Sequence, residues 1–158
     1  MDSPGFCTFD DSLWPFLMVR LRGMPTNEEF TGYLQSMRLY LQRRESHVAV
    51  LDMLQVRMTT NEQLHQQAEW VAEHEVLLGE RLLGSSFAVS SSFMRLGLNV
   101  LFYLRPPAAP YVITPSLDQA ITWGVTRLET VGMHTCAEQV RRRYVLSAEA
   151  RAAGRLLI

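Results

Sequence analysis

The chain has 158 residues, a formal net charge of -1 at neutral pH, and a composition that is 47% hydrophobic and 20% charged. This length is typical of one domain with a single core, and the small net charge provides no field that would attract nucleic acid. No apolar run approaches the roughly 20 residues that a membrane helix needs, so no membrane span is expected.

All 15 basic residues are arginines, a bias that we attribute to a GC-rich bacterial genome, with bidentate pairing to carboxylate or phosphate as the functional alternative. Cys7 and Cys136 match no metal-binding or redox spacing, so we expect two reduced thiols. The N-terminal segment carries acidic residues and no long apolar stretch, unlike a secretory signal. The composition therefore indicates a bacterial, cytoplasmic protein, and we expect no cofactor.

The first predicted elements are a strand pair and a helix. Residues 16–22 form a short β-branched and aliphatic run that ends at Gly23, which predicts a strand, and residues 5–10 are expected to pair with it as a hairpin. Thr26 and Glu29 then form a capping box, which marks a helix start. The apolar residues that follow at helical spacing are Phe30, Tyr33, Leu34, Met37 and Leu41.

Residues 46–63 predict a buried strand, a loop and a second helix. Val48–Leu51 is an apolar run too short for a helix, which favours a central strand, and Asp52 marks its expected exit. Thr59 and Thr60 begin two overlapping capping boxes. We expect the long helix that follows to end at Gly84.

The second half of the chain repeats this alternation. Residues 87–89 predict a strand, and Ser90–Ser92 supply N-cap candidates for a very apolar helix over 93–105, which ends at two prolines. Residues 111–114 predict another strand. Ser116 begins a further capping box and helix.

This order of elements predicts an α/β fold. Helical connections between strands require parallel pairing, so we expect a mostly parallel central sheet of four to five strands flanked by about four helices. Residues 1–132 are interpreted as one such domain. Residues 133–158, rich in arginine and alanine, are interpreted as a helical C-terminal extension, because their core would be too small to stand alone.

No catalytic constellation is evident. His65, Glu69 and Glu73 recur every four residues, but the second histidine of a helical zinc motif is absent, so a solvated face is the simpler interpretation. The serines at 90–92 lack a G-x-S-x-G elbow, and the glycines form no phosphate loop. Asp52 is interpreted as ordering a loop, with a role as a site carboxylate left open.

With that order of elements, the chain resembles the STAS family and its STAS-like bacterial relatives over roughly residues 10–130. Val50, Leu51 and Asp52 match the family's strand end. In the family's anti-sigma-factor antagonists, a D-S-S-G-type turn follows whose serine is phosphorylated to control partner binding, whereas Met58–Asn61 occupy that place here. The resemblance implies a STAS-like fold, and it makes Thr59 and Thr60 possible phospho-acceptors.

The sequence supports three functional hypotheses. The first is a non-enzymatic regulatory or scaffold module that binds a protein partner through Asp52, Gln55, Arg57, Thr59 and Thr60. The second, suggested by CRAL-TRIO-like proteins among the STAS-like relatives, is a binder of an apolar or lipid-like ligand beneath the helix over 93–104. The third is an enzyme that uses Asp52 with His65 or Glu69. A homodimer through Trp14, Trp70 or the apolar C-terminus is also possible.

Overall fold

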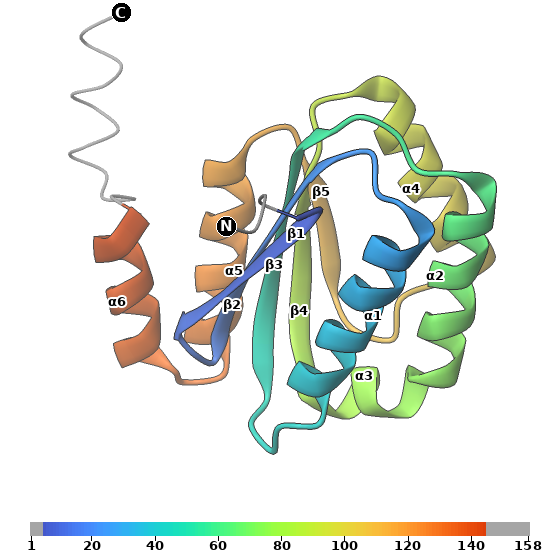
Figure 1. The fold of residues 1–158 in the computed structure, drawn as a ribbon. Helices are drawn as coiled ribbons and strands as arrows, with labels where there is room; N and C mark the ends of the chain where they lie inside the picture. The colour runs from blue at the N-terminus through green and yellow to red at the C-terminus, as the bar shows by residue number, and fades with distance from the viewer. Residues whose placement is uncertain (1–4, 145–158) are drawn as a thin grey trace, which may run out of the picture.

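A single five-stranded sheet, ordered β1-β2-β3-β4-β5, forms the centre of the computed structural model, which describes residues 5–144 (Figure 1). β1 pairs antiparallel with β2, and every later pairing is parallel. This arrangement confirms both the opening hairpin and the mostly parallel sheet. The strands are β1 Cys7–Leu13, β2 Phe16–Gly23, β3 His47–Val56, β4 Leu82–Ala88 and β5 Tyr111–Thr114.

Helices cover both faces of the sheet (Figure 1). One face carries α1 Asn27–Leu41, α2 Asn61–Glu73, α3 Glu75–Arg81 and α4 Ser92–Leu104, and the other carries α5 Leu117–Thr130 and α6 His134–Tyr144. The parallel strands advance across the sheet in one direction, and right-handed crossovers then place the connecting helices on one face. The chain returns to cover the other face only after β5.

Two apolar clusters separate along the alternating side chains of the strands. Leu17, Ala49 and Leu51 point into the cluster under α1, whereas Phe16 and Val50 point into the cluster under α5. Because successive strand residues face opposite sides, β2 and β3 contribute to both clusters, and each contains an unbroken apolar run, residues 16–19 and 48–51. This explains why the central strands appear as continuous apolar runs in the sequence.

The predicted C-terminal extension is helical where the structure describes it. Ala137 and Val140 of α6 are fully buried in the cluster that contains Phe16, and the Tyr144 ring lies 5.9 Å from the Phe16 ring. Residues 145–158 of the extension lie outside the described range. The boundary at residue 132 stays a prediction, and α6 packs closely on the domain it follows.

The expected exit of the central strand at Asp52 is wrong. β3 continues to Val56, and Asp52 pairs with Arg20 on one side and with Ala88 on the other. Its Oδ1 accepts a hydrogen bond from the Leu54 amide at 3.2 Å, where the register with β2 shifts. The register shift displaces the backbone, and the carboxylate accepts a hydrogen bond from an amide there. This explains why a polar residue occurs inside the strand.

The long helix expected to reach Gly84 is also divided differently. It breaks at His74, whose backbone is not helical. The His74 Nδ1 lies 2.8 Å from the Trp70 carbonyl oxygen, and the His74 ring stacks on the Trp70 ring with 4.4 Å between the ring centroids. The second piece ends at Arg81. Gly84 lies inside β4, so that strand begins earlier than residue 87.

The predicted helix starts are confirmed. Thr26 and Thr60 each accept a hydrogen bond from the amide three residues later, and the Glu29 and Gln63 side chains complete the two capping boxes. Of the two overlapping boxes expected at Thr59 and Thr60, only the second forms. Ser91 and Ser116 cap α4 and α5.

Candidate functional site

An apolar cavity of about 400 Å³ lies between the sheet and the helices on the α1 face. Its floor is formed by β2, β3 and β4, and its walls by α1, α2 and α4. The volume falls within the roughly 300–1,000 Å³ of small-molecule pockets. Lining residues are Leu21, Ala49, Leu51, Met53, Ser85 and Phe87 from the floor, and Phe30, Tyr33, Met37, Leu64, Trp70, Phe93, Met94, Gly97, Leu101 and Phe102 from the walls.

Helix α4 packs against the domain at its first turn, at its midpoint and near its C-terminal end, and the cavity lies along it. Met94 and Leu98 are the buried residues of this helix, and at its other end the Phe102 ring lies 5.2 Å from the Phe87 ring and 4.6 Å from the Tyr111 ring. Gly97, between these contacts, has no side chain, and nothing lies within 4 Å of where its Cβ would be. The space between the contacts is therefore left open.

Helix α4 is apolar around most of its circumference. Phe93, Leu96 and Val100 line the cavity but are also largely exposed, and Tyr103 and Leu104 are 85% and 68% exposed. A helix that is apolar all round is usually buried on all sides. Here α4 is the outer wall of a partly open cavity.

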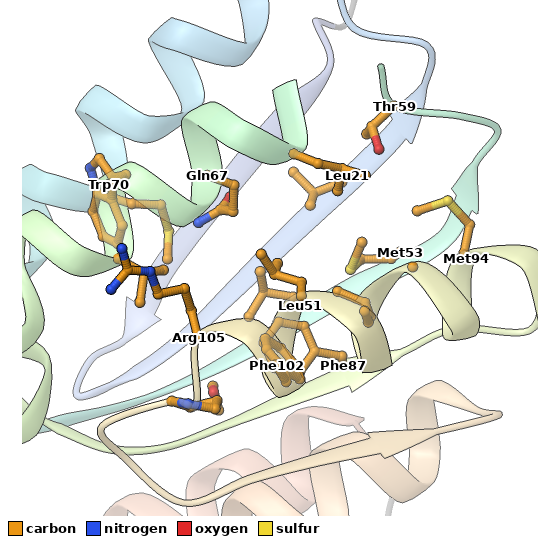
Figure 2. A pocket seen from close by; sticks show the side chains of 18 of the residues that line it. Leu21, Leu51, Met53, Thr59, Gln67, Trp70, Phe87, Met94, Phe102 and Arg105 are labelled. Carbon is orange, nitrogen blue, oxygen red and sulfur yellow. The ribbon is translucent and has the colours of Figure 1, made fainter. Parts of the chain in front are cut away.

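Few polar side chains reach the cavity, and they lie at different places along it. Figure 2 shows Arg105 extending toward Trp70 at one end, Gln67 pointing inward from α2, and Thr59 at the opposite end. Ser85 contributes to the floor. Within residues 5–144, the side chains of Arg105, Gln67 and Ser85 make no hydrogen bond or ion pair with protein groups.

Burial keeps the thiols and the lining phenol protonated. Burial raises the pKa of the Cys7 thiol, with a further contribution from Glu29, and burial also raises the pKa of Cys136, whose Sγ donates to the Leu13 carbonyl at 3.4 Å. Burial raises the pKa of Tyr33 strongly. Since the thiolate is the reactive form of cysteine, neither thiol is placed to act as a nucleophile.

The residues predicted to bind a partner do not form one cluster. Asp52 shares its face of the sheet with Val48 and Val50, under α5, whereas Thr59 lines the cavity on the other face. Gln55 and Arg57 are exposed near the end of β3. Gln55, Arg57 and the turn that follows them form one continuous segment. The Asp52 carboxylate is not part of it.

The two threonines differ in what they do. The Thr60 hydroxyl caps α2, and Gln63, which completes the box, also donates to the Pro25 carbonyl at 3.0 Å and to Asn27 Oδ1 at 3.1 Å. Thr60 thus helps to hold the start of α2 against the start of α1. The Thr59 hydroxyl makes no hydrogen bond within the described residues.

The polar stripe on α2 does not assemble a metal site. His65, Glu69 and Glu73 are described, but across residues 5–144 no three His, Cys, Asp or Glu side chains converge so as to hold a metal ion. None of the helices in this range is long and apolar enough to cross a membrane.

The three arginines near the end of α6 form ion pairs, although their side chains remain largely exposed. Arg141 pairs with Glu129, Arg142 with Glu138 at 3.3 Å, and Arg143 with Asp10 at 3.6 Å. The first and third of these pairs connect α6 to α5 and β1. These two pairs help to hold α6 against the rest of the domain.

The two tryptophans suggested for a homodimer have partners within the chain. Trp14 stacks on His47 at 4.7 Å, and the Arg43 guanidinium lies 4.6 Å from the Trp14 ring. Trp70 lines the cavity and stacks on His74. The apolar C-terminus is not among the described residues, and a homodimer stays a prediction.

Sequence reasoning missed the polar end of the cavity. The sequence predicts that the apolar helix over 93–104 can cover a ligand, but it gives no indication that Gln67 and Arg105 lie at the cavity. Their only sequence signal is position: Arg105 directly follows the apolar helix and precedes two prolines, and Gln67 lies one turn after Gln63 on α2. Neither position distinguishes a cavity residue from a solvated one.

Comparison with known proteins identifies the fold. An uncharacterised protein of the DUF3478 family with a SpoIIAA-like fold, from Shewanella loihica PV-4, superposes with a TM-score of 0.56 at 14% identity. The match covers 78% of this chain and 98% of that one. The SpoIIAA-like fold is the STAS-like fold, so the resemblance inferred from the sequence is confirmed at the level of fold. No family model and no curated protein matches the chain.

Proposed function

We propose that this protein is a non-enzymatic binding module that holds an apolar or lipid-like small molecule between α4 and the sheet. The observation that carries the proposal is the open space under α4, with apolar side chains on its floor and walls. A preformed apolar cavity with a few polar groups is typical of a small-molecule site. Its lining includes no His, Cys, Asp or Glu side chain, the groups that most often perform acid-base and nucleophilic chemistry.

A neutral fluorescent probe tests this proposal directly. N-phenylnaphthylamine is expected to gain fluorescence on binding the wild-type protein, and Gly97→Leu is expected to reduce that gain, because the new side chain would project into the open space. The matched control is Gly32→Leu on α1, another helical glycine with open space around its Cβ but outside the cavity lining.

The control variant should bind the probe as the wild type does. Equal fluorescence from both leucine variants would refute binding in this cavity. A second readout is thermal: a ligand at a hundredfold its dissociation constant stabilises the native state by about 2.7 kcal/mol. Native mass spectrometry of the purified protein would also reveal a retained ligand.

A second candidate function is regulation through a protein partner at the segment from Gln55 to Thr60. The supporting observation is that this exposed segment contains Thr59, which also lines the cavity, so an occupant of the cavity would contact the surface that a partner would read. Thr59 and Thr60 are the candidate phospho-acceptors there. Phosphorylation of Thr59 would place negative charge next to the start of α2, where it is electrostatically favourable.

Paired variants test the partner hypothesis. The double variant Gln55→Ala with Arg57→Ala should reduce recovery of a specific partner in affinity capture. A matched pair on exposed α1 positions, Gln35→Ala with Arg38→Ala, should not. Identical recovery with both double variants would remove the segment from consideration.

A further inference from the structure

We infer that the ligand of the cavity is a single-chain amphiphile with an anionic head group, a carboxylate or a phosphate, and that Arg105 binds this head. The inference rests on the proposed function and specifies its ligand class. Arg105 is the one charged residue among those that line the cavity, all of which lie in the described part of the chain. The cavity therefore has one positive end and no negative group.

The Arg105 guanidinium is available for a ligand. Among residues 5–144, no carboxylate lies within ion-pair distance of it, and it makes no hydrogen bond to the protein. Several other arginines differ in this respect: Arg43 and Arg141 pair with carboxylates, and Arg127 donates to the Leu83 carbonyl at 3.1 Å. A guanidinium binds a carboxylate or a phosphate through paired hydrogen bonds, and both anions suit it.

The surroundings of Arg105 strengthen this assignment. Figure 2 shows the Arg105 side chain reaching toward Trp70, with Gln67 directed into the same cavity from α2. The Gln67 amide, also without a protein partner among the described residues, supplies two further donors for a head-group oxygen. The positive end thus has both charge and hydrogen-bond donors.

The rest of the cavity suits one apolar chain. From Arg105 the space continues past Leu51 and Phe102 toward Met94 and Thr59 at the other end (Figure 2). Its volume of about 400 Å³ lies in the lower part of the range for small-molecule sites, which favours one acyl chain over the two of a bilayer phospholipid. A ligand with its anionic head at Arg105 and its apolar chain along the sheet would match the one charged end and the apolar remainder of the lining.

A series of probes with one chain and different heads tests the inference. Dodecanoate, dodecyl phosphate, dodecanol and dodecyltrimethylammonium, each kept below its micelle concentration, are titrated against protein loaded with N-phenylnaphthylamine. We expect the anionic probes to displace the dye at concentrations about tenfold lower than dodecanol, because a hydrogen bond to a charged group is stronger than a neutral one. The carboxylate and phosphate arms distinguish the two anionic heads.

Arg105→Gln is expected to remove this preference, so that the anionic probes and dodecanol displace the dye at similar concentrations. The control is Arg95→Gln, on α4, the helix that Arg105 follows. The Arg95 guanidinium lies 3.5 Å from the Val89 carbonyl oxygen, and this residue does not line the cavity. This variant should retain the tenfold preference. Because Arg105 is exposed, its replacement should not alter folding, and circular dichroism of each variant checks this.

Three outcomes overturn the inference. Equal displacement by anionic and neutral probes, or tighter binding of the cationic probe, would refute an anionic head while leaving the cavity proposal intact. A preference that persists in Arg105→Gln would refute the role of that residue. If no probe binds and Gly97→Leu has no effect on the dye, the proposed function itself fails.

Discussion

His47 makes the stability of this domain sensitive to mildly acidic pH. Its ring is 2% exposed, stacks on Trp14, and has no hydrogen-bond partner for Nδ1 among the described residues. Burial lowers the pKa of His47 from 6.5 to about 4. Well above pH 6.5 the ring is therefore uncharged in the folded and the unfolded protein, and its titration has no effect on stability there.

Below a pH of about 6.5 the unfolded chain takes up a proton that the folded His47 does not. The free energy of unfolding must therefore fall as the pH drops from about 6.5 to about 4, and this effect levels off below that window. At about 1.4 kcal/mol per pKa unit, the difference corresponds to about 3 kcal/mol. That is a large part of the 5–15 kcal/mol that typically stabilises a domain.

Urea denaturation across this pH range, in the wild type and in His47→Phe, measures the effect. Phenylalanine keeps an aromatic ring against Trp14 but cannot be protonated. The stability difference between the two proteins should shift by about 3 kcal/mol in favour of the variant on acidification. Carboxylates such as Asp10 titrate in both proteins, so their contributions cancel in the difference between the two free energies of unfolding. His65→Gln, which replaces an exposed histidine, is the control. If the free energy of unfolding depended on pH in the same way in the wild type and in His47→Phe, the reasoning would be refuted.

Four further predictions concern packing and capping, and the free energy of unfolding of each variant is measured by urea denaturation. Gly84→Ala should lower the free energy of unfolding by about 1–3 kcal/mol, because the new Cβ would lie 2.7 Å from the Trp123 ring. Gly97→Ala should raise it by about 0.5–1 kcal/mol, because residue 97 is on a helix and has open space around the new Cβ. Thr60→Ala should lower the free energy of unfolding by about 1 kcal/mol, because the helix cap is lost. An unchanged denaturation midpoint would show that the capping box at Thr60 does not stabilise the domain. Deletion of residues 133–158 should markedly lower stability by uncovering an apolar face of the domain, and a fully stable truncated chain would show that the first 132 residues suffice.

Much of the fold was predictable because its signals are local. The capping boxes at Thr26 and Thr60 depend on residues three positions apart, and the two apolar faces of β3 make Val48–Leu51 a continuous hydrophobic run. What failed depended on partners distant in sequence. Asp52 resembled a strand end because it is charged, but pairing with Arg20 and Ala88 keeps it within the sheet.

The break at His74 shows the same limit on sequence reasoning. Leu78 and Leu82 continue the apolar spacing of the preceding helix, so the pattern favoured one long helix. The structure divides it at His74 and begins β4 at Leu82, with Gly84 packed closely against Trp123 on α5. Only the approach of a helix from the other face of the sheet explains why a glycine occurs there.

The candidate site was hardest to predict because a cavity is defined by atoms that are missing. The residues that line it, such as Leu51 and Phe87, have the same character as those of a filled core, and α4 satisfies the pattern of a buried helix equally well. What distinguishes the site is that Gly97, with nothing near its Cβ, and Arg105, a charge without a protein partner in the described chain, both line the same cavity. The proposal of a ligand therefore rests on an open space beside an unpaired cation, a combination that packing alone does not require.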